Sequence, residues 1–232
     1  LGRPVSSLPA ASDLGWSQPL TASEPVAVIW WLVLVSVLGA CVLPLVPILL
    51  PAFPDAGVGF ARLLGLVVVG YLTWLLVSLD LMPFTMPWLL VPTAMVAVAA
   101  AVSARLPPGE LLAALGRRGP MILASEAAFW SAFFVFLAFR WLNPDLWHPF
   151  FGGEKPMELA YINAIARSST FPPYDPWFAD GSMNYYYYGF YLVALLWKLT
   201  GVDPAIGFQL AIATLAGMFA SALFSVGSAI SR

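Results

Sequence analysis

Long apolar runs, separated by short stretches rich in proline, glycine and charge, dominate this chain. A helix needs about 20 consecutive apolar residues to cross the ~30 Å hydrocarbon core of a bilayer, and several runs reach that length. The runs are continuous rather than alternating, which predicts membrane helices and not the strands of a barrel. We predict six spans, at residues 26–50, 60–79, 88–104, 121–141, 185–200 and 205–230.

Composition supports this pattern. Apolar residues make up 61% of the 232 residues and charged residues only 9%, against roughly 25% charged residues in soluble domains. The predicted fold class is therefore an all-α integral membrane protein with about six transmembrane helices. The predicted organisation is an exterior tail (1–24), a four-helix membrane region (25–141), an exterior loop with a short surface helix (142–184) and two C-terminal transmembrane helices (185–232).

The positions of the basic residues predict the orientation. The connection between the third and fourth spans carries three arginines, Arg105, Arg117 and Arg118, whereas the connection before the third span carries Asp80 and no base. Because short cytoplasmic loops are enriched in arginine and lysine, we place the three arginines inside a plasma membrane. The N-terminus, the 142–184 loop and the C-terminus are then exterior, and Lys198 is cytoplasmic. A net charge of −2 without a basic run predicts no nucleic-acid partner.

The loop at 142–184 is the polar exception in an apolar chain. Pro156 suits the first turn of a helix, and the apolar residues that follow recur at helical spacing. These are Met157, Ala160, Tyr161, Ala164 and Ile165. The pattern predicts a short amphipathic helix on the membrane surface, then an extended proline-rich return, because a residue before proline avoids the α region. The tyrosine run 185–188 then opens the fifth predicted span.

The order of motifs in this loop resembles that of the Chlor_Arch_YYY membrane-protein family. The motifs are Glu-Lys-Pro-Met-Glu (154–158), Asn-Ala-Ile-Ala-Arg-Ser (163–168), Phe-Pro-Pro-Tyr-Asp-Pro-Trp-Phe-Ala (171–179) and Asn-Tyr-Tyr-Tyr-Tyr-Gly (184–189). The resemblance is strong over about residues 150–200 and looser over the next span. The combination of motifs is specific to the family, whereas the tyrosine run alone is not.

The arrangement of span, exterior loop, surface helix and return span also resembles the start of the GT-C glycosyltransferase module. That resemblance implies transfer of a sugar from a polyprenyl-phosphate donor, with an acidic catalytic or metal-binding residue in the first exterior loop. By position, this acid is Glu154, with Glu158 as second choice. Lys155 stands where GT-C proteins commonly have a second acid, which departs from a metal-chelating pair. The resemblance assigns no metal ligand, and it leaves a divalent metal as an open alternative.

An inverting transfer requires a base for the acceptor hydroxyl and a cation for the leaving phosphate. Glu154 is the predicted base. The predicted substrate-binding residues are Lys155 and Arg167 for phosphate, Trp177, Tyr185 and Tyr186 for sugar, and Asp175 as a further ligand. The structural alternatives are that Glu154 only complements the positive end of a helix, and that Asp175 only makes a turn before proline.

Two other functions remain open from the sequence. A non-catalytic accessory subunit of a larger membrane complex, photosynthetic or respiratory, would account for ten tryptophans and sixteen phenylalanines as packing surface. A transporter is suggested by two prolines in the first span and by Glu126 inside the fourth, but there are no repeated halves. We expect Glu126 to pair with Arg117 or Arg118, because an unpaired carboxylate is costly in a membrane.

The GT-C interpretation leaves a question of size. Only two predicted spans follow the motif loop, and a complete module usually has more. The chain starts at Leu1 rather than methionine and stops directly after a span. We therefore expect a processed or truncated product, with the C-terminal helices as part of a shortened GT-C-like module.

Overall fold

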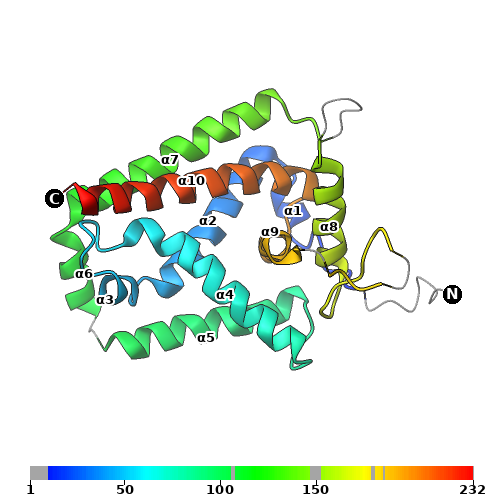
Figure 1. The fold of residues 1–232 in the computed structure, drawn as a ribbon, viewed down its shortest axis with the longest axis horizontal. Helices are drawn as coiled ribbons and strands as arrows, with labels where there is room; N and C mark the ends of the chain where they lie inside the picture. Colours follow the sequence, from blue (N-terminus) through cyan, green and yellow to red (C-terminus); the bar gives the residue numbers. More distant parts are fainter. Residues whose placement is uncertain (1–9, 106–107, 147–152, 179–180, 185, 232) are drawn as a thin grey trace. The chain divides into compact units, whose positions relative to one another are not determined.

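The computed structural model describes residues 10–105, 108–146, 153–178, 181–184 and 186–231. The regular secondary structure of these residues is helical, with two isolated β-bridges beside it (Figure 1). The helices, in chain order, are α1 (Gln18–Thr21), α2 (Glu24–Val42), α3 (Val46–Leu49), the 3-10 turn η2 (Val58–Phe60), α4 (Ala61–Ser78), α5 (Met86–Ala104), α6 (Pro108–Gly116), α7 (Gly119–Leu142), α8 (Lys155–Arg167), α9 (Tyr187–Thr200) and α10 (Pro204–Ile230). The predicted all-α membrane fold is confirmed.

Five helices within the described residues are long and apolar enough to cross a membrane, one fewer than predicted. They are Glu24–Val42, Val58–Ser78, Met86–Ala104, Gly119–Leu142 and Pro204–Ile230. The predicted span at 185–200 is a helix, but α9 has 14 residues and is therefore only about 21 Å long. That length is well below the ~30 Å of the hydrocarbon core. The helix and its bounds agree with the prediction to within two residues, and the expectation that it crosses the membrane is the part that differs.

The end of the first predicted span is interrupted, as its prolines indicated. Helix α2 ends at Val42, and Pro44 lies in the turn before α3. Pro47 occupies the first turn of α3, where a missing N–H costs nothing. Helix α6 was not predicted at all, because its nine residues are too few to produce a convincing apolar period.

The chain divides into two compact units. The first contains Leu1–Leu34, Gly70–Pro92 and Asn143–Phe208, and the second contains Val35–Val69, Thr93–Leu142 and Gln209–Arg232. Four of the long helices, α2, α4, α5 and α10, contribute residues to both. Within the first unit, large side chains such as Trp31, Phe84, Tyr191 and Trp197 are fully buried. In the second unit, Phe129 and Phe133 are fully buried.

Helices α2 and α4 approach closely in the second unit. A Cβ placed on Gly65 of α4 would lie 2.1 Å from the carbonyl oxygen of Leu38 in α2. One on Gly39 would lie 3.2 Å from the backbone of Arg62. Small residues at such crossings let membrane helices pack backbone to backbone. The glycines therefore set the distance between these two helices.

Glu126 of α7 pairs with Arg62 of α4, and not with Arg117 or Arg118 as predicted. The guanidinium donates two hydrogen bonds, of 2.7 and 2.8 Å, to the two carboxylate oxygens. It also lies 4.1 Å from the centre of the Phe129 ring. The prediction was wrong because it sought a base near Glu126 in the chain, whereas Arg62 is 64 residues away. Arg118 instead donates to backbone carbonyls.

Candidate functional site

The predicted catalytic residues lie at the start of α8, in the first unit. Gly153, with a φ of 59°, turns the chain before the helix, and Glu154 occupies the N-cap position. The Glu154 carbonyl accepts a hydrogen bond of 2.9 Å from the Glu158 N–H, which puts the two residues one turn apart on one side of the helix. Glu154 is exposed, and its side chain makes no capping hydrogen bond. Its carboxylate is therefore not used in capping the helix.

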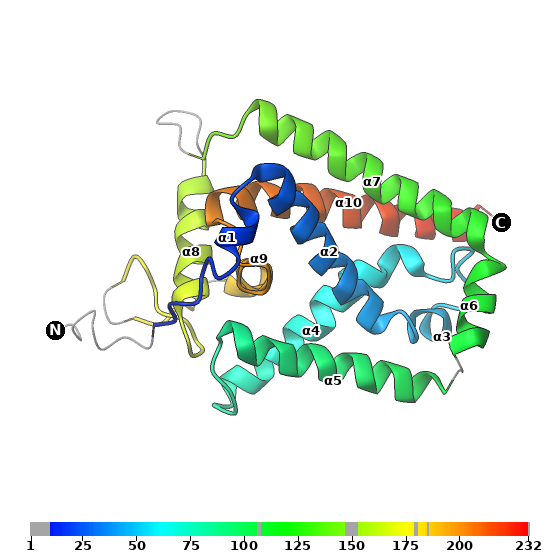
Figure 2. The ribbon, with the colours of Figure 1, turned by 180° about the vertical axis from the view of Figure 1, so that it is seen from behind.

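Helix α8 packs against α9 on the side that also carries Glu158. Tyr161 stacks on Phe190 with ring centres 5.8 Å apart, and Ile162 and Ile165 are buried. The helix predicted after Pro156 is confirmed, and part of its apolar face packs on α9 (Figure 2). Its place on the membrane surface stays a prediction. The stack lies about one turn along α8 from Glu158 and about one turn along α9 from Tyr186. It thus fixes the position of the two segments that carry predicted site residues.

The predicted phosphate-binding cations are not together. Lys155 is beside Glu154, and its ammonium reaches the carbonyl of Asp145 at 3.5 Å. Arg167 is the last residue of α8, and twelve residues of helix separate it from Lys155 by about 18 Å. Its backbone carbonyl accepts a hydrogen bond of 2.6 Å from Ala11, and its side chain is exposed. A single phosphate beside Glu154 therefore has Lys155, and not Arg167, as its neighbouring cation.

Asp175 has a local structural role. Its carboxylate accepts a hydrogen bond of 2.8 Å from the N–H of Trp177, the geometry of an Asx turn. Its own N–H donates to the Gly181 carbonyl at 2.9 Å, beside a bridge between Tyr174 and Ser182. The Trp177 side chain is 64% exposed. The turn thus presents Trp177 outward and uses one oxygen of Asp175.

The tyrosine run divides between the interior and the surface. Tyr186 is 85% exposed at the start of α9, whereas Tyr187 and Tyr188 face Trp74. The Trp74 indole N–H donates to the Tyr187 hydroxyl at 2.8 Å, and the Tyr188 ring lies edge-on to it at 6.2 Å. Tyr185, a predicted sugar-binding residue, lies outside the described residues. Of the described tyrosines in the run, Tyr186 alone presents an exposed ring.

Three further aromatic rings pack together in this unit, and they come from segments that are far apart in the chain. Phe84 precedes α5, Phe171 follows α8, and Tyr191 belongs to α9. Their centres lie 5.0 to 5.6 Å apart, a spacing typical of favourable aromatic pairs. The Tyr191 hydroxyl donates to the Gly70 carbonyl at 2.7 Å. The 142–184 loop is thus attached to α4, α5 and α9 through one aromatic cluster.

The sequence interpretation missed a buried ion pair next to this cluster. The Lys198 ammonium donates to the Asp13 carboxylate at 2.6 Å, and the lysine side chain is fully buried. The other oxygen of Asp13 accepts the N–H of Met86, and the ammonium lies 5.0 Å from the Phe84 ring. Burial lowers the pKa of Lys198, while the hydrogen bond and the charge of Asp13 oppose this shift.

This pair corrects the predicted side for Lys198. We placed residue 198 on the cytoplasmic side and the N-terminal tail, which holds Asp13, outside, but the two side chains are in contact. The short length of α9 explains the error, since its end lies on the same side as the tail. Further bonds tie the tail to α9: the Trp16 indole donates to the Lys198 carbonyl at 2.8 Å, and the Ser17 hydroxyl donates to the Thr200 carbonyl at 2.6 Å.

A family model described as "Uncharacterized membrane protein (DUF2298)" matches residues 68–232. The chain belongs to the DUF2298 family. The matched residues contain the whole of the 142–184 loop, the tyrosine run and α9, so the DUF2298 region holds Glu154, Glu158 and Lys198 but not Asp13. No curated protein and no solved structure matches the chain. Membership of DUF2298 agrees with the predicted membrane location.

The metal-ligating side chains of the described residues do not gather in one place. Among the described residues there is no group of three His, Cys, Asp or Glu side chains placed to hold one. Glu154 and Glu158 supply two carboxylates, and their immediate neighbour is a lysine.

Proposed function

We propose that this DUF2298 protein is a GT-C-like membrane glycosyltransferase, or the part of one that carries the donor loop. In this proposal the first unit takes a sugar from a polyprenyl-phosphate donor at the exterior face of the plasma membrane. The observation that carries it is the exposed Glu154 at the start of α8, followed one turn later by the half-buried Glu158, in a helix that is fixed to α9. This position corresponds to that of the acidic residue in the loop that the chain resembles.

The proposed orientation follows from the five candidate spans. With α9 too short to cross, five crossings put the end of α10 on the opposite side from the start of α2. The three-arginine connection still faces the cytoplasm by the positive-inside rule. The 142–184 loop, Asp13 and Lys198 then face the exterior together, and the end of α10 is cytoplasmic.

The proposed chemistry is a single inverting displacement. The Glu154 carboxylate accepts the proton of the acceptor hydroxyl as its oxygen attacks the anomeric carbon, and the bond from that carbon to the phosphate oxygen breaks. The polyprenyl phosphate leaves with the bonding electrons. The ammonium of Lys155 stabilises the charge that develops on the phosphate.

Besides the base and the cation, such a site needs surfaces that contact the sugar ring and the lipid, and exposed aromatic rings suit both. The rings of Trp177 and Tyr186 are 64% and 85% exposed, and exposed aromatic rings suit contact with a sugar or with the lipid interface. Glu158 lies one turn from Glu154 and serves as the second carboxylate. Asp175 keeps one oxygen free of the Asx turn for a sugar hydroxyl. Arg167, at the far end of α8, is placed to meet an anionic group of the acceptor or of a neighbouring lipid.

The test is consumption of a lipid-linked sugar by the full chain in nanodiscs. Undecaprenyl-phosphate-linked glucose with a radiolabelled sugar is the probe, and loss of label from the lipid fraction is the measurement. We expect Glu154→Gln to slow this loss by about 10²- to 10⁴-fold, the usual contribution of a general base. Glu110→Gln is the control, because Glu110 is an exposed glutamate at the start of another short helix.

Retained turnover in Glu154→Gln, with normal expression, would contradict the proposal. Equal losses in Glu154→Gln and Glu110→Gln would also contradict it, because they would show a general effect of charge. If the wild-type chain consumes no donor and purifies in a stable complex without bound polyprenyl phosphate, the accessory-subunit interpretation replaces this one.

A further inference from the structure

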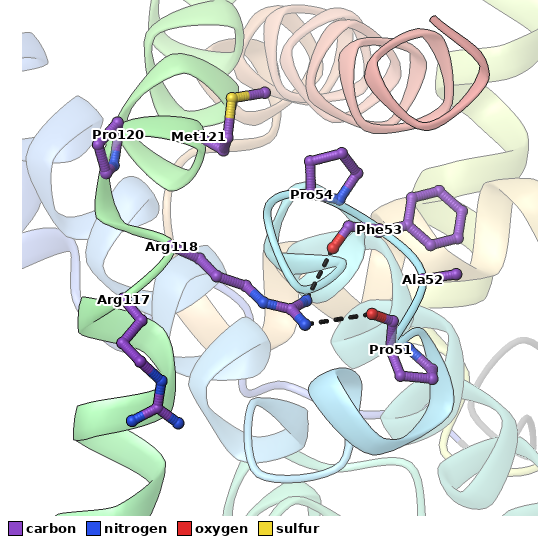
Figure 3. A pocket seen from close by; sticks show the side chains of 8 residues that line it. All are labelled: Pro51, Ala52, Phe53, Pro54, Arg117, Arg118, Pro120 and Met121. Atoms are coloured by element: carbon purple, nitrogen blue, oxygen red, sulfur yellow. Dashed lines mark hydrogen bonds between the residues drawn. The ribbon is translucent and has the colours of Figure 1, made fainter. Parts of the chain in front are cut away.

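A pocket in the second unit lies where the loop before η2 meets the turn between α6 and α7. Its volume is about 280 Å³, near the lower end of the usual range for ligand pockets. Its walls combine two arginines, Arg117 and Arg118, with apolar side chains such as Phe53, Pro54 and Met121 (Figure 3). Two cations beside apolar surface favour a ligand that is anionic at one end and apolar at the other.

The loop carbonyls hold Arg118 in this pocket. Its two terminal nitrogens donate to the carbonyls of Phe53 and Pro51, at 2.8 and 3.2 Å. Carbonyl oxygens orient a guanidinium but leave its charge in place, and its remaining N–H groups can serve another acceptor. Arg118 is therefore a positioned cation whose charge is not cancelled by a bonded carboxylate.

Arg117 adds a second, more accessible charge. It is exposed, and in Figure 3 its guanidinium points away from the carbonyls that bind Arg118. Among the described residues, the ion pairs are Arg62 with Glu126 and Lys198 with Asp13, so neither pocket arginine is in one.

The nearest acid along the loop is already bound elsewhere. Asp55 is fully buried, and its carboxylate accepts hydrogen bonds from the N–H groups of Gly57 and Gly59 and, at 2.5 Å, from the Ser225 hydroxyl. These three donors occupy both of its oxygens. Its single negative charge leaves the two arginines with an excess of positive charge.

The pocket also lies at the end of a candidate membrane span. Helix α7 is a candidate span that begins at Gly119, directly after the two arginines, and Pro120 and Met121 of its first turn line the pocket. The end of a span lies near the boundary between hydrocarbon and water. Helix α6, just before the arginines, exposes Leu112 by 70%, as expected for a helix near that boundary.

We propose that this pocket binds the phosphate of an anionic phospholipid headgroup, with Arg117 and Arg118 as its ligands. The planar guanidinium presents paired N–H donors that match phosphate oxygens. The proline, phenylalanine and methionine side chains contact the glycerol and the first acyl carbons. This site is independent of the proposed sugar transfer, because its residues belong to the other unit.

The experiment measures lipid retention by the full chain with native mass spectrometry. The protein is released from micelles that contain equal amounts of phosphatidylglycerol and phosphatidylcholine. We expect the wild-type chain to retain one phosphatidylglycerol in preference to phosphatidylcholine. Arg117→Gln should reduce the affinity for phosphatidylglycerol at least fivefold, because one basic residue near an anionic surface contributes about 1 kcal/mol of binding free energy. Arg117→Lys should lose less, because it keeps the charge and loses only the paired donors.

Arg105→Gln is the matched control. Arg105 belongs to the same connection between spans, is exposed and does not line the pocket, so its replacement removes the same charge and should leave the retained lipid in place. Arg118→Gln should abolish retention, but it also releases the loop at Phe53. The test therefore depends on Arg117→Gln, because within the described part of the chain the Arg117 side chain forms no hydrogen bond or ion pair whose loss could affect folding.

Three results would overturn the proposal. The first is equal retention of the two lipids by the wild-type chain. The second is an equal loss in Arg105→Gln and Arg117→Gln, which would show general attraction to a charged surface. The third is binding of inorganic phosphate, and of no lipid, by the wild-type chain, which would show that the pocket takes a free anion.

Discussion

Removal of Asp13 should destabilise the protein through Lys198, the fully buried cation that it neutralises. In Asp13→Ala the ammonium stays buried and loses its carboxylate, while the Phe84 ring remains 5.0 Å from the charge. Loss of one partner of a buried ion pair costs about 3–5 kcal/mol. Because the Asp13 side chain is 19% exposed, we expect the lower end, about 3 kcal/mol, or roughly a hundredfold in the folding equilibrium.

A double-mutant cycle separates this effect from the loss of the Asp13 bond to Met86. Lys198→Met keeps most of the apolar stem and leaves Asp13 in contact with Met86 and water, so it should cost about 1 kcal/mol. The double variant Asp13→Ala, Lys198→Met no longer buries a lone charge. It should therefore be more stable than Asp13→Ala alone, with a coupling free energy of about 2 kcal/mol.

The assay is equilibrium unfolding by SDS in mixed micelles, followed by tryptophan fluorescence, since Trp16 and Trp30 lie at the contacts between the tail and α9. Glu24→Gln is the control, because Glu24 is exposed and should change the free energy of unfolding by less than about 0.5 kcal/mol. Two results would contradict the buried ion pair: an Asp13→Ala variant that unfolds like the wild-type chain, or strictly additive changes in the free energy of unfolding for the two substitutions.

Two further predictions concern the second unit. Arg62→Met should lower the free energy of unfolding by about 2–3 kcal/mol, because it leaves the Glu126 carboxylate without its two charged hydrogen bonds. The same SDS titration should find Glu126→Gln less harmful, and equal stability of Arg62→Met and the wild-type chain would contradict the pairing. Gly65→Ala should cost about 1–3 kcal/mol, because its methyl group would overlap the backbone of Leu38. Gly227→Ala, where an added Cβ meets nothing within 4 Å, should be neutral or stabilising by up to about 1 kcal/mol, and an equal loss in both variants would refute the close approach.

The sequence predicted those elements whose signals are local. The apolar spacing after Pro156 located α8, and Pro44 and Pro47 located the end of α2. The prediction failed where the structure depends on distant partners. An apolar run from 185 to 200 has the composition of a span, and the burial of Lys198 at its end depends on Asp13, a residue 185 positions away in a stretch without periodicity.

The candidate site was predictable in its parts but not in their arrangement. The loop motifs located Glu154 and Glu158, and the helix between Lys155 and Arg167 was foreseen. Its consequence, that the two cations lie about 18 Å apart, follows only once the helix runs unbroken between them. The tyrosine run likewise gave no sign that α9 starts at Tyr187, which turns Tyr186 outward and leaves Tyr187 and Tyr188 against Trp74.

The ion pair between Asp13 and Lys198 also constrains the order in which the protein can be completed during synthesis. The two residues are 185 positions apart, and at about 5–20 residues per second the ribosome needs roughly 10–40 s to pass from one to the other. Throughout that interval the tail around Trp16 and Ser17 has no α9 to bind, although α2 has already emerged. Four of the five candidate spans in the described residues are therefore made before Lys198, so the segment around Asp13 waits through their synthesis for the partner that completes its contacts.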